Sequence, residues 1–107
     1  MSKHLLFLCS QNKLRSPTAE AVFSDYPGVE VDSAGLNDSA EIPVTAEHLD
    51  WADHIFLMET KQRERLNRKF GSFLKGKTLT VLNIPDDYAY MNEALVQLLK
   101  KKCAAYF

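Results

Sequence analysis

The sequence is poor in cysteine, and this shortage excludes two kinds of small protein. Cys9 and Cys103 are the only cysteines among 107 residues, and they lie almost at opposite ends of the chain. A disulfide-rich secreted domain or a tetrahedral zinc site needs a denser framework of cysteine and histidine. We therefore expect a reducing, cytoplasmic environment and no metal centre.

Net charge and long apolar runs are also lacking. Thirteen Lys and Arg residues against fourteen Asp and Glu residues leave a formal net charge of −1, which argues against binding of duplex nucleic acid through bulk positive charge. The apolar run at residues 5–8 is too short for a signal segment, and no stretch approaches the ~20 apolar residues that span a bilayer. We expect neither a membrane nor a nucleic acid as a structural partner.

The composition is otherwise that of an ordinary globular domain. Hydrophobic residues make up 46% of the chain and charged residues 25%, so a disordered or fibrous chain is excluded. A chain of this length buries roughly two-thirds of its unfolded surface, which is enough for one core without disulfide or metal staples. Residues 1–107 are therefore expected to form a single domain.

Short apolar runs alternate with helical periodicity along the chain. The pattern predicts strands at 5–9, 29–32, 54–58 and 78–82, and helices near 17–25, 46–51, 60–70 and 92–103. Strands that alternate with helices form a parallel sheet covered on both faces. The expected fold class is therefore three-layer α/β, with a four-stranded parallel sheet flanked by helices and ligands at the carboxyl ends of the strands.

Turn and cap residues mark the ends of the expected helices. Pro17 suits the first turn of a helix, where its missing N–H costs nothing. Thr45, Thr60 and Asn92 are the expected N-terminal caps, because their side-chain oxygens can accept from free backbone N–H groups. Gly71 fits the left-handed position that ends many helices.

The loop between the first strand and the first helix carries the chemistry. It begins at Cys9 and ends at Arg15 and Ser16, a C-x5-R-S spacing that lets the backbone curl its N–H groups inward around an anion. Cys9 would lie at the bottom of this nest as a stabilised thiolate, and the planar guanidinium of Arg15 suits two phosphate oxygens. Candidate substrate-binding or loop-organising residues are Ser10, Gln11, Asn12, Lys13, Leu14 and Ser16.

The spacing alone has an alternative explanation. A cysteine at the end of a buried strand, followed by a solvated arginine, would give the same pattern without any chemistry. The context favours a phosphate-binding, nucleophilic loop, because the run joins a buried strand to a helix with Pro17 in its first turn and has Ser16 directly after Arg15.

Four segments resemble the low-molecular-weight protein tyrosine phosphatases, a family that includes thioredoxin-coupled arsenate reductases. The first, residues 7–20, is similar to the phosphate-binding loop of the family. Residues 31–35 and 52–58 are similar to two family strands, and residues 85–88 lie where the family has an Asp-Pro-Tyr loop with its general acid. The segments occur in family order over nearly the whole chain, which implies the flavodoxin-like topology of that family.

The resemblance implies a role for each matching residue. Cys9 becomes the nucleophile, Arg15 the phosphate clamp, and Asn12 and Ser16 the organisers of the thiolate and the loop. Asp86 becomes the general acid, with Asp87 as the alternative at the adjacent position. Apart from the resemblance, the ring of Tyr88 or Tyr90 could flank an aryl phosphate, or either ring could instead cap the core. No cofactor is implied.

Departures from the family pattern bear on substrate and redox behaviour. Gln11 stands where the family commonly has glycine, so strain or a different loop path is expected there. Leu14 replaces a second loop cysteine that can protect the nucleophile. The chain is also shorter than typical members. An arsenate reductase needs further cysteines near the nucleophile, and only Cys103 remains, which argues against that activity.

The sequence thus predicts a cysteine-dependent phosphomonoesterase that acts through a cysteinyl-phosphate intermediate. The resemblance implies that the substrate is a protein that carries phosphotyrosine, as for a protein tyrosine phosphatase. The same chemistry on a small-molecule or nucleic-acid phosphate is the alternative, because shortened cleft walls leave specificity open. A non-catalytic phosphate-binding module is the third possibility, but a pure binding module needs neither the Cys9 nucleophile nor a candidate acid.

Overall fold

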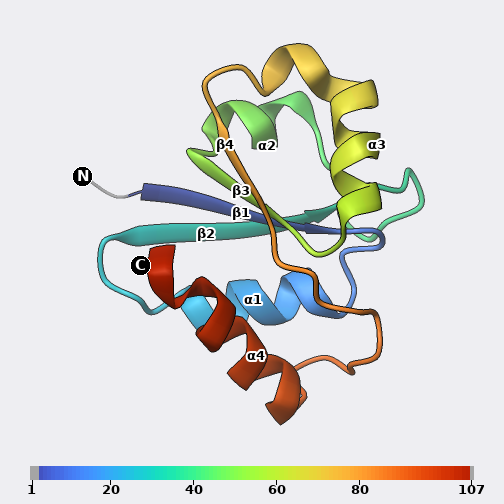
Figure 1. The fold of residues 1–107 in the computed structure, drawn as a ribbon. Coiled ribbons are helices and arrows are strands. Elements are labelled where there is room, and N and C mark those ends of the chain that lie inside the picture. The colour runs from blue at the N-terminus through green and yellow to red at the C-terminus, as the bar shows by residue number, and fades with distance from the viewer. Residues whose placement is uncertain (1–2, 107) are drawn as a thin grey trace.

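The computed structural model describes residues 3–106 as four strands and four α-helices (Figure 1). The strands are β1 (Lys3–Cys9), β2 (Val29–Gly35), β3 (His54–Leu57) and β4 (Thr78–Val81). The helices are α1 (Arg15–Phe23), α2 (Ala46–Trp51), α3 (Thr60–Phe70) and α4 (Glu93–Cys103), with short 3-10 turns at Gly71–Phe73 and Ala104–Tyr106.

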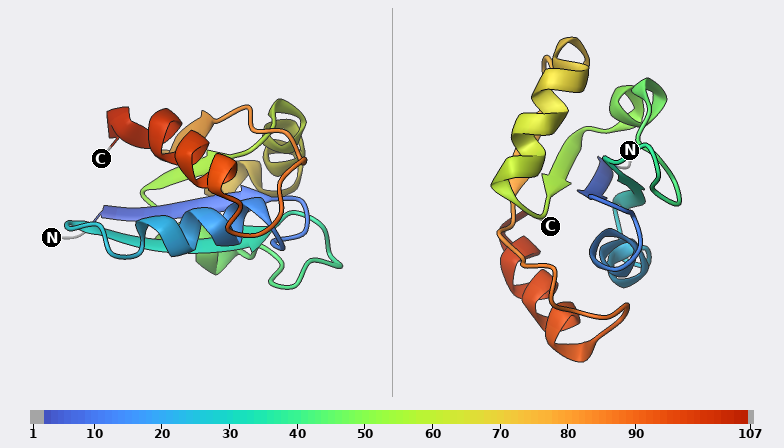
Figure 2. Two further views of the ribbon diagram at one scale, coloured as in Figure 1. Left: turned by 90° about the horizontal axis from the view of Figure 1, so that it is seen from below. Right: turned by 90° about the vertical axis from the view of Figure 1, so that its right-hand side faces the viewer.

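The strands form one parallel sheet in the order β2-β1-β3-β4. Helices α1 and α4 cover one face and α2 and α3 the other, as the end-on view of Figure 2 shows. This arrangement confirms the predicted three-layer α/β fold with a four-stranded parallel sheet. Because all strands run the same way, their carboxyl ends meet at one edge, where the loops after β1 and β4 come together.

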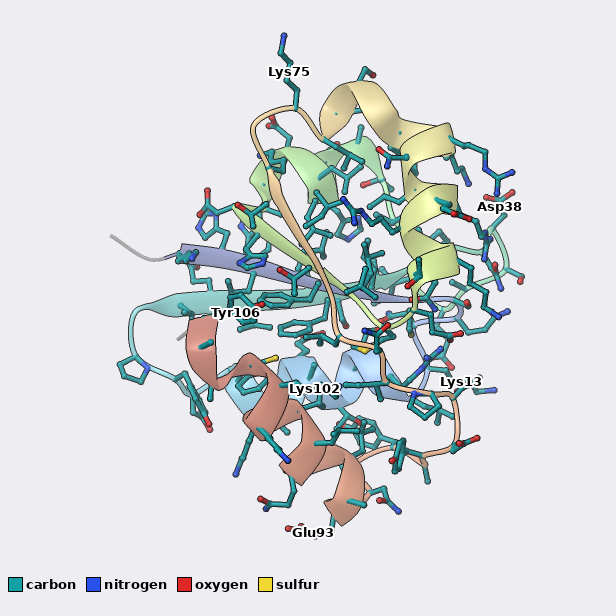
Figure 3. The ribbon with its side chains drawn as sticks, viewed as in Figure 1. Lys13, Asp38, Lys75, Glu93, Lys102 and Tyr106 are labelled. Atoms are coloured by element: carbon teal, nitrogen blue, oxygen red, sulfur yellow. The ribbon has the colours of Figure 1, made fainter. Side chains whose placement is uncertain are left out.

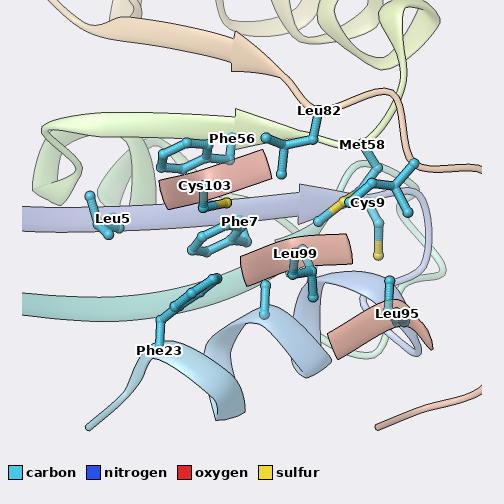
Figure 4. Packing of buried hydrophobic residues seen from close by; sticks show 12 residues of the cluster. Leu5, Phe7, Cys9, Phe23, Phe56, Met58, Leu82, Leu95, Leu99 and Cys103 are labelled. Carbon is cyan, nitrogen blue, oxygen red and sulfur yellow. The ribbon is translucent and has the colours of Figure 1, made fainter. Parts of the chain in front are cut away.

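Strand β1 lies inside the sheet and contributes to a core on each face. Leu5 and Phe7 belong with Cys9 to the cluster beneath α1 and α4, whereas Leu6 and Leu8 belong to the cluster beneath α2 and α3. This alternation follows from the two-residue period of a strand. Figure 4 shows the first cluster, in which the Phe7 and Phe56 rings stack at 4.7 Å. Burial of such a side chain stabilises the fold by about 1.5–3 kcal/mol.

Several element ends differ from the prediction. β1 begins at Lys3 and β2 continues to Gly35, because the two strands pair over their full length, from Lys3 with Val29 to Cys9 with Gly35. β3 ends at Leu57 and β4 at Val81, each one residue early. Helix α1 begins at Arg15, so that Pro17 is its third residue. Pro17 is still tolerated, because the first four N–H groups of a helix have no intrahelical partner.

The predictions for both ends of α3 were wrong. Glu59 precedes the helix and Thr60 is its first residue, because the backbone N–H of Glu59 donates to the side-chain oxygen of Gln62 and closes the first turn. Gly71 has φ −49°, in the right-handed region. The chain tightens there into a 3-10 turn, which leads the buried Leu74 into the core.

The N-terminal caps of α2 and α4 are the residues that the sequence predicts. The Thr45 hydroxyl accepts from the backbone N–H of His48, and the Asn92 side chain accepts from the N–H groups of Ala94 and Leu95. The longest helices in residues 3–106 have 11 residues. In that part of the chain no helix combines the length and apolar character that a bilayer crossing requires.

Candidate active site

Cys9 ends β1 at the carboxyl edge of the sheet, and its side chain is almost fully buried. The sulfur accepts a hydrogen bond from the backbone N–H of Asn12 at 3.2 Å and lies 2.9 Å from the Ser16 hydroxyl oxygen. Asn12 adopts φ 53°, in the left-handed region that asparagine tolerates, and this bends the chain sharply at the middle of the loop. The loop therefore brings the Asn12 N–H and the Ser16 hydroxyl to the sulfur.

Ser16 and Asn12 also contact each other beneath the loop. The Ser16 hydroxyl lies 3.0 Å from the Asn12 side-chain oxygen and is fully buried. The hydroxyl carries one proton, so it donates either to the asparagine oxygen or to the sulfur. The first arrangement suits a Cys9 thiol, which can donate to Ser16, and the second suits a thiolate. Gln11 is not among the described non-glycine residues with positive φ. Its φ angle therefore does not show the backbone strain that was expected where the family commonly has glycine.

The segment after β2 supports the loop from one side. The backbone N–H groups of Leu36, Asn37 and Glu41 donate to the carbonyls of Cys9, Ser10 and Gln11 at 2.9, 2.9 and 3.1 Å. This close approach depends on Gly35, because a Cβ there would lie 2.9 Å from the Asn12 nitrogen and from the Gln11 carbonyl carbon. Residues 36–44 are rich in polar and turn-forming residues, and the structure makes part of this segment the scaffold of the loop.

Two acceptors bind one nitrogen of the Arg15 guanidinium. Its Nη1 donates to the Glu59 carboxylate and to the Ile84 carbonyl, both at 2.7 Å. The side chain is only 3% exposed. The hydrogen bond from Arg15 lowers the pKa of Glu59, so that this carboxylate stays ionised beside the guanidinium. Nη1 is thereby occupied, and Nε and Nη2 remain to bind two oxygens of an anion.

A second residue of the β3–α3 corner contacts the loop. Gln62 is fully buried, and its amide nitrogen donates to the Ser10 hydroxyl at 3.2 Å. Its oxygen accepts from the backbone N–H groups of Met58 and Glu59, each at 3.0 Å. Glu59 and Gln62 were missed at the sequence level. The one available signal was their place just after a buried strand, at the edge where ligands bind.

A cavity of about 190 Å³ opens over these groups. Its lining residues are Cys9, Ser10, Gln11, Lys13, Leu14, Arg15 and Asp86. Lys13 lies exposed at the edge where β1 ends (Figure 3). A larger hollow of about 250 Å³ lies beside α2, but its lining residues include no cysteine or arginine. The cavity at Cys9 is therefore the candidate active site.

The candidate acids are separated by the geometry. Asp86 lines the cavity with a carboxylate oxygen 3.7 Å from Arg15 Nε, and its side chain is 65% exposed. Asp87 and Tyr88 are not among the lining residues. Tyr88 instead packs against the core cluster beneath α1 and α4. Asn12 and Ser16 lie beneath the cavity, where they contact the sulfur.

Comparison with known proteins shows the family of this chain. No protein-family model matches the chain. A protein-arginine-phosphatase from Geobacillus stearothermophilus is 31% identical over 105 residues, in an alignment that covers 76% of this chain and 70% of that protein. The solved structures that superimpose on this chain include low-molecular-weight protein tyrosine phosphatases and arginine phosphatases. This chain belongs to the low-molecular-weight protein tyrosine phosphatase family.

Two solved structures illustrate the family fold. The tyrosine phosphatase Wzb from Escherichia coli K30, in complex with phosphate, superimposes with a TM-score of 0.79 at 19% identity, covering 99% of this chain and 96% of that one. A low-molecular-weight protein tyrosine phosphatase from Streptococcus pyogenes gives 0.78 at 19% identity, covering 97% and 90%. Both share the family's fold with this chain over nearly their whole length.

Proposed function

We propose that this chain is a cysteine-dependent phosphatase that acts on phosphorylated proteins. The observation that supports this most directly is the convergence of three groups on one cavity: the Cys9 sulfur, the Arg15 guanidinium and the Asp86 carboxylate. Each group has a distinct task in phosphoryl transfer. A cytoplasmic location stays our prediction, because the Cys9 thiol reacts only when it is reduced. We also propose that residues 1–107 act as one domain.

The reaction proceeds in two displacements. The Cys9 thiolate attacks phosphorus in line, so that an S–P bond forms while the bond to the leaving group breaks, and Asp86 gives its proton to the leaving atom. A water molecule then attacks the cysteinyl-phosphate, Asp86 takes a proton from that water, and inorganic phosphate leaves with the thiolate restored. The loop N–H groups and Arg15 stabilise the equatorial oxygens throughout, so that no metal ion or other cofactor is needed.

Phosphotyrosine is the side chain that we propose as the preferred substrate. Lys13 and Arg15 both line it, and positive charge favours a dianionic phosphate on a neutral phenol. Phosphoarginine is the second candidate, because the curated relative is a protein-arginine-phosphatase. Its guanidinium would bring positive charge close to Lys13, and like charges repel. Small-molecule and nucleic-acid phosphates complete the set of substrates to be compared.

The experiment is a substrate panel run with the wild type and Cys9→Ser. A phosphotyrosine peptide, a matched phosphoarginine peptide, a nucleotide and a sugar phosphate are compared by phosphate release. We expect wild-type turnover to be fastest on the phosphotyrosine peptide and to be abolished by Cys9→Ser. Phosphate binding without any turnover would instead indicate a binding module, and turnover that survives Cys9→Ser would exclude the proposed nucleophile.

Asp86 and Asp87 are compared in the same way. We expect Asp86→Asn to slow an alkyl phosphate by about 10²-fold or more, the scale of general acid catalysis. A nitrophenyl phosphate should suffer less, because nitrophenolate leaves without a proton. Asp87→Asn is the matched control and should leave both rates nearly unchanged. If Asp87→Asn gives the selective loss instead, the acid is Asp87.

A further inference from the structure

The loop that carries Asp86 is attached at both of its ends to residues of α1. We call residues 84–91 the acid loop. At its start, the Ile84 carbonyl accepts from Arg15 Nη1 at 2.7 Å. At its end, the backbone N–H of Met91 donates to the Thr18 hydroxyl at 3.0 Å. The first attachment uses the phosphate clamp itself, whereas the second uses a residue with no contact to the cavity.

Thr18 lies in α1 and is fully buried. Its hydroxyl donates to the Leu14 carbonyl at 2.6 Å and accepts from Met91. Threonine side chains in helices commonly donate to the backbone carbonyl four residues earlier. Acceptance from a residue 73 positions away is not local. One hydroxyl thereby joins Leu14, which lines the cavity, to the end of the acid loop.

Between these anchors the acid loop has few polar contacts, and Tyr88 packs against the core cluster beneath α1 and α4. Within the described part of the chain, its other polar contacts are a bond from the Ile84 N–H to the Met58 carbonyl at 2.9 Å, the 3.7 Å approach of Asp86 to Arg15, and a bond from the Asn92 N–H to the Ala89 carbonyl. Met91 is exposed and has φ 58°, a conformation that methionine adopts rarely. The bond to Thr18 helps to hold that conformation, and so fixes where the loop returns toward α4.

We propose that Thr18 is a positioning residue for the general acid. Through Met91 it sets the path of the acid loop, and thereby the position of the Asp86 carboxylate relative to Cys9 and Arg15. The inference rests on the proposed function, because it assigns Thr18 to the protonation step of that reaction. Loss of the hydroxyl should therefore impair proton transfer to the leaving group more than attack by the thiolate.

The test uses Thr18→Val, which keeps the shape of the side chain and removes the hydroxyl. kcat/KM is measured over aryl phosphates whose leaving phenols range from nitrophenol to phenol, because this constant reports the first chemical step. We expect a loss of about 10-fold on phenyl phosphate and less than about 3-fold on nitrophenyl phosphate, a fraction of the full effect of a general acid. Thr18→Ser retains the hydroxyl and should restore the wild-type dependence on the leaving group.

Two controls separate positioning from a structural role. Thr78→Val makes the same chemical change at an exposed site at the start of β4, away from the carboxyl edge, and should alter no rate. In the Asp86→Asn background, Thr18→Val should add no further dependence on the leaving group, because the group that it positions is already gone. If Thr18→Val does not fold, Thr18→Ala against Thr18→Ser gives the same comparison.

The outcomes distinguish the inference from the proposed function. An equal loss on every aryl phosphate, or a weaker inhibition by inorganic phosphate, would show that Thr18 supports the phosphate loop and would overturn the inference. An additive effect in the Asp86→Asn background would do the same. No turnover by the folded wild type would refute the proposed function itself, and the inference with it.

Discussion

Gly35 is the residue whose substitution should damage the active site most clearly without touching a candidate catalytic group. A Cβ at this position would lie 2.5 Å from the Ala40 Cβ, and 2.9 Å from the Asn12 nitrogen and the Gln11 carbonyl carbon. Two of these three atoms belong to the backbone of the Cys9 loop, so no side-chain rotation relieves the contact. Gly35→Ala must therefore move the loop.

The size of the effect follows from these distances. Contacts of 2.9 Å must lengthen by about half an ångström to reach ordinary van der Waals separation, and the Ala40 contact must lengthen by more. Overpacking of this kind costs about 1–3 kcal/mol of the free energy of unfolding. A displacement approaching 1 Å at the reacting groups lowers kcat/KM by about 10²-fold, because the Asn12 N–H and the Cys9 sulfur move apart.

Gly71→Ala is the matched control. Nothing lies within 4 Å of a Cβ built at Gly71, and its φ of −49° suits alanine. This variant should keep wild-type activity and gain up to about 1 kcal/mol of stability. Denaturant unfolding and kcat/KM on an aryl phosphate are measured for both variants. If Gly35→Ala stays within about 3-fold of wild-type activity with an unchanged unfolding midpoint, the loop does not depend on close approach at this glycine.

Three further predictions concern charge and reactivity. Burial raises the pKa of Cys103 to about 12, so iodoacetamide at neutral pH should alkylate Cys9 first, and equal labelling by mass spectrometry would contradict this. The hydrogen bond from Arg15 lowers the pKa of Glu59. The ion pair therefore stabilises the fold above the ordinary pKa of glutamate, and this stabilisation is lost as the pH falls through the folded-state pKa of Glu59. Glu59→Gln should thus lower the free energy of unfolding by about 1 kcal/mol near pH 7, and by progressively less as the pH falls below the ordinary pKa of glutamate, in denaturant titrations. Lys13→Gln should raise the ratio of phosphoarginine to phosphotyrosine turnover, and an unchanged ratio would refute the charge argument.

The fold and the phosphate loop could be predicted because their signals are local. The apolar run before Cys9 and the fixed spacing to Arg15 lie within one strand–loop–helix unit. The rest of the site is assembled from distant segments. Glu59 reaches Arg15 across 44 residues and Gln62 reaches Ser10 across 52, and no spacing rule in a single sequence brings such residues together.

The resemblance favoured Asp86 over Asp87 as the general acid, but no local signal in the sequence shows which of the two carboxylates lines the cavity. Asp86 and Asp87 have the same chemistry, and only the path of the acid loop decides which of them lines the cavity. That path depends on Arg15 at one end and Thr18 at the other. The ends of α3 were misassigned for a related reason, because the side chain of Gln62 and the burial of Leu74 outweighed the local preferences of Thr60 and Gly71.

The strand order has a consequence for the sequence of events during folding. β1, α1 and β2 are contiguous in the chain and adjacent in space, and units rich in short-range contacts close first because they cost the least chain entropy. Residues 3–35 contain the loop from Cys9 to Arg15, whereas the acid loop follows β4 and β4 pairs with β3. We therefore expect the growing chain to acquire its phosphate-binding half before its proton donor, and to become an enzyme only when the last third of the sequence has docked.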